Sequence, residues 1–221
     1  EFKYDFSSTS EKEKYQEEYD KMYAECKRTL YSAGYHIYTS IDPDVQKQLQ
    51  SSVDNALSGY TEKDKNGIYK TQASGTCIDN DTGKVVAIVG GREQKNIGYT
   101  LNRAFQSPRQ PGSAIKPLLV YAPALEHGWS AGSTVNDSPM STKDKNRVRN
   151  SHGSYSGQIS LRRAVQKSSN VATMRIYEQL TPKTCLKYLE EMNFKYLTDS
   201  DYKYYTTCIG GFRKGTTAEE M

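Results

Sequence analysis

The sequence predicts an α+β domain built on an antiparallel sheet. Residues 35–40 alternate and are rich in β-forming side chains, and the apolar runs 73–78 and 84–89 are joined by a polar turn. Helical patterns then fill most of the second half of the chain. Strands that come first, followed by helices without regular alternation, are typical of an α+β fold.

The composition excludes several classes of protein. The chain has 221 residues, which suits one domain with an appendage, and a net charge of +4, which is too small for a dedicated nucleic-acid binder. It has no run of about 18 apolar residues and no signal-peptide pattern, so no membrane span is expected within it. It opens without Met, and we expect it to have been excised from a longer protein.

The first thirty residues predict an amphipathic helix over 10–30 that connects to the domain. Ser10 followed by Glu13 is a capping-box pattern at its start, and Gly34 ends the unit. The stripe on this helix consists of Tyr15, Tyr19, Met22, Tyr23 and Cys26.

A second helix is expected after Asp42 and Pro43, which suit the N-cap and the first helical position. The turn at 79–83, between the two apolar runs, has two interpretations. Its acidic residues resemble part of a calcium loop, but the glutamate that closes a twelve-residue EF-hand loop is absent. We therefore expect a hairpin turn.

The cysteines and histidines predict no metal site and no cofactor. The four cysteines form no CxxC pair and no histidine stands at metal-ligand spacing. Free thiols are favoured, because Cys77 and Cys208 lie in apolar contexts, although wide spacing leaves a disulfide open. His36, His127 and His152 fit no catalytic triad and are read as structural or surface residues.

Further elements are expected in the second half of the chain. Pro123 should kink a helix over 113–127, since it removes one backbone hydrogen bond. Residues 129–157 read as a loop that carries a solvated basic stretch at 143–149, for which contact with an anionic polymer stays open. The remaining predictions are helices over 160–166, 171–180 and 182–192 and a short strand over 204–210.

Ser113 and Lys116 are the first candidates for chemistry. Pro-Gly breaks the chain just before Ser113, Pro117 fits near a helix start, and an apolar helix follows, so Lys116 lies one turn after Ser113 on the same face. A serine hydroxyl needs a neighbouring base, and a lysine with a lowered pKa can serve. Another SxxK occurs at Ser200 and Lys203, but it lies in a polar stretch with no helix expected after it.

The second candidate is the tripeptide Ser168-Ser169-Asn170, which falls at the junction of two expected helices. It can place a hydroxyl and an amide into a cleft. Taken alone, it reads as a helix cap.

Together these motifs resemble class A, bifunctional penicillin-binding proteins, in which S-x-x-K pairs with S-x-N and K-T-G. The run Arg-Gln-Pro-Gly-Ser-Ala-Ile-Lys-Pro at 109–117 is similar to the family's nucleophile block. Residues 37–46, 157–172 and 209–221 resemble three further blocks in the family's order, so the resemblance covers about residues 30–221.

The resemblance implies the family's transpeptidase fold, an antiparallel sheet flanked by helices, over residues 35–221, with 1–34 as a linker helix. Ser113 would be the nucleophile of a D,D-transpeptidase that crosslinks peptidoglycan stem peptides ending in D-Ala-D-Ala, and the target of β-lactams. Lys116 would be its base, Ser168 would relay a proton, and Asn170 would bind the substrate amide. A glycosyltransferase domain would precede the chain, on the outer face of the cell membrane.

The sequence departs from the family pattern in two places. It contains no Lys-Thr-Gly or Lys-Ser-Gly, so we expect the domain to be cut short before the third motif and this stretch alone to be weak or inactive. Pro123 stands where the family helix usually has another residue. The alternatives are a non-catalytic scaffold or β-lactam sensor, which the intact motif residues argue against, and a single-domain β-lactamase, which the linker-like first helix disfavours.

Overall fold

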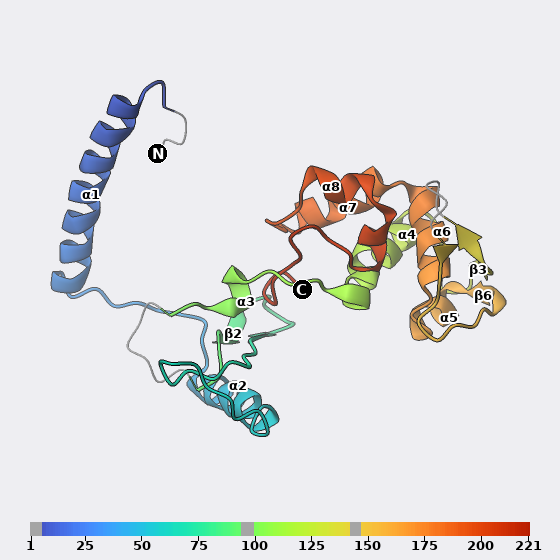
Figure 1. Cartoon of the computed structure of the whole chain (residues 1–221), viewed down its shortest axis with the longest axis horizontal. Helices are drawn as coiled ribbons and strands as arrows, with labels where there is room; N and C mark the ends of the chain where they lie inside the picture. Colours follow the sequence, from blue (N-terminus) through green and yellow to red (C-terminus); the bar gives the residue numbers. More distant parts are fainter. Residues whose placement is uncertain (1–5, 94–99, 142–146) are drawn as a thin grey trace. The chain divides into compact units, whose positions relative to one another are not determined.

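The computed structural model describes residues 6–93, 100–141 and 147–221. The chain divides into two compact units, residues 1–40 and 41–221 (Figure 1). No helix in the described part of the chain is long and apolar enough to cross a membrane.

The first unit carries one long helix, α1 (Thr9–Ser32), where the sequence predicted one. Its cap was placed wrongly, because the N-cap is Ser8, whose Oγ accepts a hydrogen bond from the Glu11 N–H at 3.2 Å. The spacing of a capping box occurs twice in this stretch, and only the earlier serine has the extended backbone that a cap requires. The tyrosines of the predicted stripe stack along the helix, with the rings of Tyr15 and Tyr19 6.4 Å apart.

The strand predicted over 35–40 is not formed. The reason lies in the edge of β2 (Val85–Val89), which other groups already occupy. The Asp42 N–H donates to the Val86 carbonyl at 2.8 Å. The Gln46 side chain donates to the Ile88 carbonyl at 3.0 Å and accepts the Ile88 N–H at 2.8 Å. A glutamine thus takes the place of a neighbouring strand at this edge.

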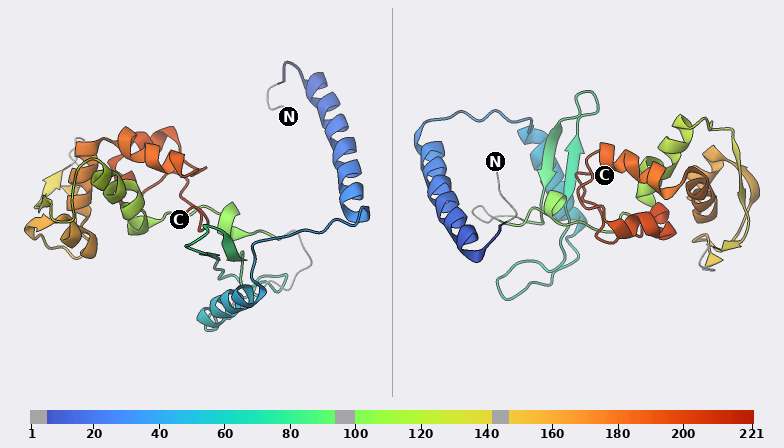
Figure 2. Two further views of the ribbon diagram at one scale, coloured as in Figure 1. Left: turned by 180° about the vertical axis from the view of Figure 1, so that it is seen from behind. Right: turned by 90° about the horizontal axis from the view of Figure 1, so that it is seen from above.

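Gln46 belongs to α2 (Pro43–Ala56), whose predicted N-cap at Asp42 is confirmed. The helix lies beside the predicted hairpin of β1 (Gly75–Ile78) and β2 (Figure 2). The two strands are antiparallel, and the turn between them closes on the Asp79 carboxylate, which accepts the Thr82 hydroxyl at 2.6 Å.

The segment that carries Ser113 is helical throughout, but it changes type twice. It begins as a 3₁₀ turn, η1 (Gly112–Ile115), widens to a π-helical turn, η2 (Pro117–Tyr121), and ends as α4 (Ala122–Glu126). The Ala122 N–H bonds to the Pro117 carbonyl, five residues back. The kink predicted at Pro123 is therefore a widened turn just before the proline, which has no N–H to continue the α-helical pattern.

The loop predicted over 129–157 contains short strands. After α3 (Arg103–Gln106), strand β3 (Thr134–Asp137) pairs antiparallel with β6 (Gly157–Ser160). Strand β4 (Met140–Ser141) pairs with β5 (Arg147–Val148). Strands of two to four mostly polar residues are too short for a readable alternation. Most of the basic stretch lies outside the described residues.

The three later helices are confirmed as α5 (Leu161–Gln166), α6 (Asn170–Leu180) and α7 (Pro182–Glu191). The strand predicted over 204–210 is wrong, because that stretch forms the 3₁₀ helix η3 (Tyr205–Ile209), which follows the unpredicted helix α8 (Asp199–Lys203).

Side chains explain why η3 forms in place of a strand. The Thr207 hydroxyl donates to the Asp201 carbonyl at 2.9 Å, and Gly210 ends the turn with φ of 93°. These local bonds satisfy the backbone without a partner strand, and they turn Thr207 and Cys208 into the core.

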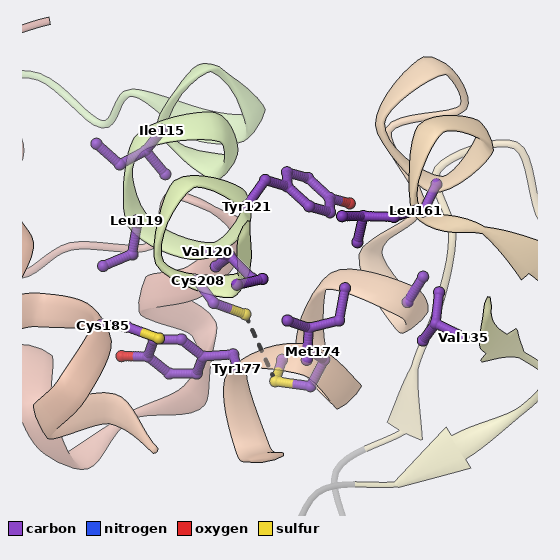
Figure 3. Packing of buried hydrophobic residues seen from close by; sticks show 14 of the residues in the cluster. Ile115, Leu119, Val120, Tyr121, Val135, Leu161, Met174, Tyr177, Cys185 and Cys208 are labelled. Atoms are coloured by element: carbon purple, nitrogen blue, oxygen red, sulfur yellow. Dashed lines mark hydrogen bonds between the residues drawn. The ribbon is translucent and has the colours of Figure 1, made fainter. Parts of the chain in front are cut away.

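The core packs the Ser113 segment against α6, α7 and η3 (Figure 3). Leu119 and Val120 meet Met174 and Tyr177 of α6 there, all of them buried. The cysteines are all free, as the sequence favoured. The buried core residues that Figure 3 labels are Ile115, Leu119, Val120, Tyr121, Val135, Leu161, Met174, Tyr177, Cys185 and Cys208.

Candidate active site

Ser113 lies exposed in the 3₁₀ turn η1, directly after Gly112. The Lys116 N–H donates to the Ser113 carbonyl, which closes that turn. In a 3₁₀ helix, residues three apart are eclipsed, so the two side chains leave the same face. The turn thus presents the hydroxyl to solvent at the start of a buried helical segment.

Lys116 is buried, with 2% of its surface exposed. Its Nζ donates to the Ser168 carbonyl at 2.8 Å, to Ser168 Oγ at 3.2 Å and to Asn170 Oδ1 at 2.7 Å. An ammonium has three donors and no acceptor, so these three oxygens satisfy it completely. The structure therefore brings together three of the four predicted site residues.

Burial lowers the pKa of Lys116 to about 8, and the nearby Cys208 opposes this shift only in part. All three oxygens around the ammonium belong to uncharged groups. A carboxylate partner would hold the lysine in its charged form, whereas neutral acceptors in a desolvated site leave the amine accessible near neutral pH.

The second motif lies between α5 and α6, as predicted. Ser169 is the N-cap of α6 and accepts the Ala172 N–H at 3.0 Å. Ser168 has a positive φ of 49°, which is uncommon for a residue with a side chain. This backbone turn directs both its carbonyl and its hydroxyl to Lys116. Within this motif, Ser169 caps the helix, whereas its neighbours Ser168 and Asn170 contact Lys116.

Ser113 stands apart from this hydrogen-bonded group. Within the described residues, neither its hydroxyl nor its backbone N–H makes a hydrogen bond. A free hydroxyl and a free N–H on one residue can attack a carbonyl and hold its developing oxyanion. Hydrogen bonds of catalytic groups commonly tighten only when substrate is bound.

The second SxxK pair has a different environment. Ser200 and Lys203 lie in the short helix α8, which the sequence analysis did not predict. Lys203 is exposed, in contrast to the buried Lys116. The two SxxK motifs have the same spacing, but only the lysine of the first one is buried.

A segment near the C-terminus packs against the residues just before Ser113, and sequence reasoning assigned no role in the site to this segment. Arg109 and Thr216 exchange two backbone hydrogen bonds of 2.8 Å each. A Cβ on Gly210 would lie 2.2 Å from the Gly112 Cα. The pair of glycines at 210–211 was the only sequence signal for such a close approach.

Sequence reasoning also missed two buried polar residues behind the second motif. Asp137 and Asn150 are 0% and 4% exposed and both contact Ser169. Their positions in short, irregular strands and loops carry no motif. In residues 6–93, 100–141 and 147–221, no group of three or more His, Cys, Asp or Glu could hold a metal ion.

Comparison with known proteins decides the family. The model of the penicillin-binding protein transpeptidase domain matches residues 73–210, which include Ser113, Lys116, Ser168 and Asn170. The chain belongs to the penicillin-binding protein transpeptidase family. The α+β fold expected from the resemblance is thereby confirmed, and so is the resemblance to class A penicillin-binding proteins.

Two relatives illustrate the match. Penicillin-binding protein 1A of Clostridium perfringens is 38% identical over 191 residues, which cover 80% of this chain and 27% of that protein. Penicillin-binding protein 4 of Bacillus subtilis is 32% identical over 194 residues, which cover 87% of this chain and 29% of that protein. The chain thus spans less than a third of the length of either relative.

Solved structures agree on the fold. The PonA1 protein of Mycobacterium tuberculosis in complex with penicillin V gives a TM-score of 0.68 at 22% identity, over 88% of this chain and 51% of that one. Penicillin-binding protein 1A of Haemophilus influenzae gives a TM-score of 0.58 at 27% identity, over 72% of this chain and 24% of that one.

Proposed function

We propose that this chain is a serine D,D-transpeptidase domain that crosslinks peptidoglycan stem peptides through an acyl-enzyme on Ser113. The observation that carries the proposal is the contrast between an exposed serine and a buried lysine one turn later, whose pKa is lowered to about 8. This is the pairing of nucleophile and base that acyl transfer to serine requires.

In the first step, the neutral amine of Lys116 takes the proton of the Ser113 hydroxyl as Oγ attacks the carbonyl of the penultimate D-Ala. The Ser113 N–H stabilises the oxyanion. The bond to the terminal D-Ala then breaks, and its nitrogen takes a proton from the Lys116 ammonium, relayed by the Ser168 hydroxyl. The result is an ester on Ser113 and free D-Ala.

In the second step, an amine of another stem peptide attacks the ester, a new amide bond forms, and Ser113 recovers its proton. A β-lactam enters the same first step, but its broken amide stays attached through the opened ring, so the ester persists. The second N–H of the Asn170 amide is available for the substrate, since one N–H already donates to the Arg149 carbonyl.

The setting of the domain is proposed from its relatives. The name penicillin-binding protein 1A and the small share of those proteins that this chain spans support a longer, bifunctional protein. We propose that a glycosyltransferase domain precedes the chain there and that the transpeptidase works at the outer face of the cell membrane.

Release of D-Ala from a synthetic peptide ending in D-Ala-D-Ala tests the function, measured on the natural polypeptide that carries this sequence. Ser113→Ala should abolish release and Lys116→Ala should lower it by about 100-fold or more, as loss of a general base does. Ser200→Ala is the matched control and should keep the wild-type rate. Release by the Ser113→Ala variant would contradict the proposal.

A further inference from the structure

Both ends of the Asn150 amide are hydrogen-bonded inside the protein, where this residue is 4% exposed. Its Nδ2 donates to Asp137 Oδ1 at 2.7 Å and to the Ser154 carbonyl at 3.0 Å. Its Oδ1 accepts the Val171 N–H at 3.2 Å and lies 3.2 Å from the Ser169 hydroxyl. An amide side chain offers two donors and one acceptor oxygen with two lone pairs, so Asn150 has one orientation only.

Asp137 anchors this arrangement from the end of β3. It is fully buried, and its Oδ1 also accepts the Ser169 hydroxyl at 2.9 Å. Its Oδ2 accepts the Ser156 N–H at 3.0 Å. Asp137 and Asn150 thus tie the β3–β6 pair to the first turn of α6, where the second motif ends.

Asn150 affects the candidate site through the residue before it, Arg149. The carbonyl of Arg149 accepts a hydrogen bond from Asn170 Nδ2 at 2.9 Å. This contact determines which end of the Asn170 amide is the nitrogen, so its oxygen faces Lys116 at 2.7 Å. A reversed amide would direct two N–H donors at the lysine ammonium.

We propose that Asn150 is a positioning residue of acyl transfer, which fixes the Arg149 carbonyl so that the Asn170 amide offers its oxygen to Lys116. The role rests on the proposed transpeptidase function, but Asn150 touches neither the nucleophile nor the base. It acts through the backbone of the residue before it and through the first turn of α6.

Titration of Lys116, followed by NMR of its labelled side chain, tests the proposal without any need for activity. An oxygen that accepts a hydrogen bond from an ammonium stabilises the charged form. In Asn150→Ala the Asn170 amide loses its fixed orientation, so the Lys116 midpoint should fall below that of the wild type. The matched control is Leu189→Ala, which removes a buried side chain of α7 away from this network and should leave the midpoint unchanged.

The acylation rate with a penicillin gives the second reading. Asn150→Ala should lower it about 10- to 100-fold, a loss typical of small displacements of catalytic groups, whereas Leu189→Ala should change it only in proportion to its folded fraction. If Asn150→Ala does not fold, Asp137→Asn removes one acceptor from the same network and should shift the midpoint in the same direction.

The outcomes separate the two proposals. A Lys116 midpoint that is unchanged or raised in the folded variant overturns the positioning role, even if the wild type is acylated. A wild-type protein that is not acylated contradicts the transpeptidase function, while the titration still decides the role of Asn150.

Discussion

At the scale of single residues, the site depends on a lysine that is buried without a counter-charge. Three uncharged oxygens surround the Lys116 ammonium, and burial lowers its pKa to about 8. Both forms of the side chain are therefore present near neutral pH. The charged form can return a proton to a leaving group, and the neutral form can take one from Ser113.

This environment predicts the pH dependence of acylation. The neutral amine is the reactive form, so the rate with a penicillin should rise as pH increases through about 8 and level off above it. Lys116→Arg should lose this rise and at least about 100-fold in rate, because a guanidinium does not deprotonate in this range. Lys203→Arg is the control. A flat wild-type profile between about pH 7 and 9, on the order of one unit either side of the midpoint, would argue against Lys116 as the base.

The site residues differ in how far the sequence could predict them. Ser113 and Lys116 could be found because they are three positions apart and the Pro-Gly and Pro punctuation marks a helix start. Ser168 and Asn170 are more than fifty positions away from Lys116, and only the resemblance to a family joined them to it. Asp137 and Asn150 could not be predicted, since a buried hydrogen bond between irregular segments leaves no local pattern.

At the scale of elements, the two strand predictions that failed share one cause. Residues 35–40 and 204–210 both have the composition of strands, but a strand needs a free partner edge. The edge of β2 is bonded by Asp42 and Gln46, and η3 satisfies its own backbone with help from Thr207. Whether a partner is available depends on tertiary structure, which local sequence does not encode.

The close approach of η3 to η1 gives a prediction for Gly210. Its φ of 93° disfavours any side chain, and a Cβ would lie 2.2 Å from the backbone of Gly112, next to Ser113. Gly210→Ala should cost about 2–4 kcal/mol of unfolding free energy in urea, and it should slow acylation beyond the loss of folded protein. Gly59→Ala, which meets no atom within 4 Å, is the control. Equal stability of the two variants would contradict the observed contact.

At the scale of the whole molecule, the order of elements was more predictable than their pairing. The hairpin of β1 and β2 and the helices α2, α5, α6 and α7 follow strong periodic patterns with caps and breakers at their ends. The β3–β6 and β4–β5 pairs are too short for such patterns. Asp137 nevertheless ends β3 and Asn150 follows β5 by two residues, so the least predictable part of the fold supports part of the candidate site.

The most direct test of the account is to locate the covalent adduct after incubation with a penicillin. The natural polypeptide that carries this sequence should gain the mass of one penicillin. Proteolysis and fragmentation should place that mass on Ser113, with no adduct on Ser200 and none in the Ser113→Ala variant. An adduct on Ser200, or one that persists in Ser113→Ala, would contradict the assignment of the nucleophile and with it the proposed mechanism.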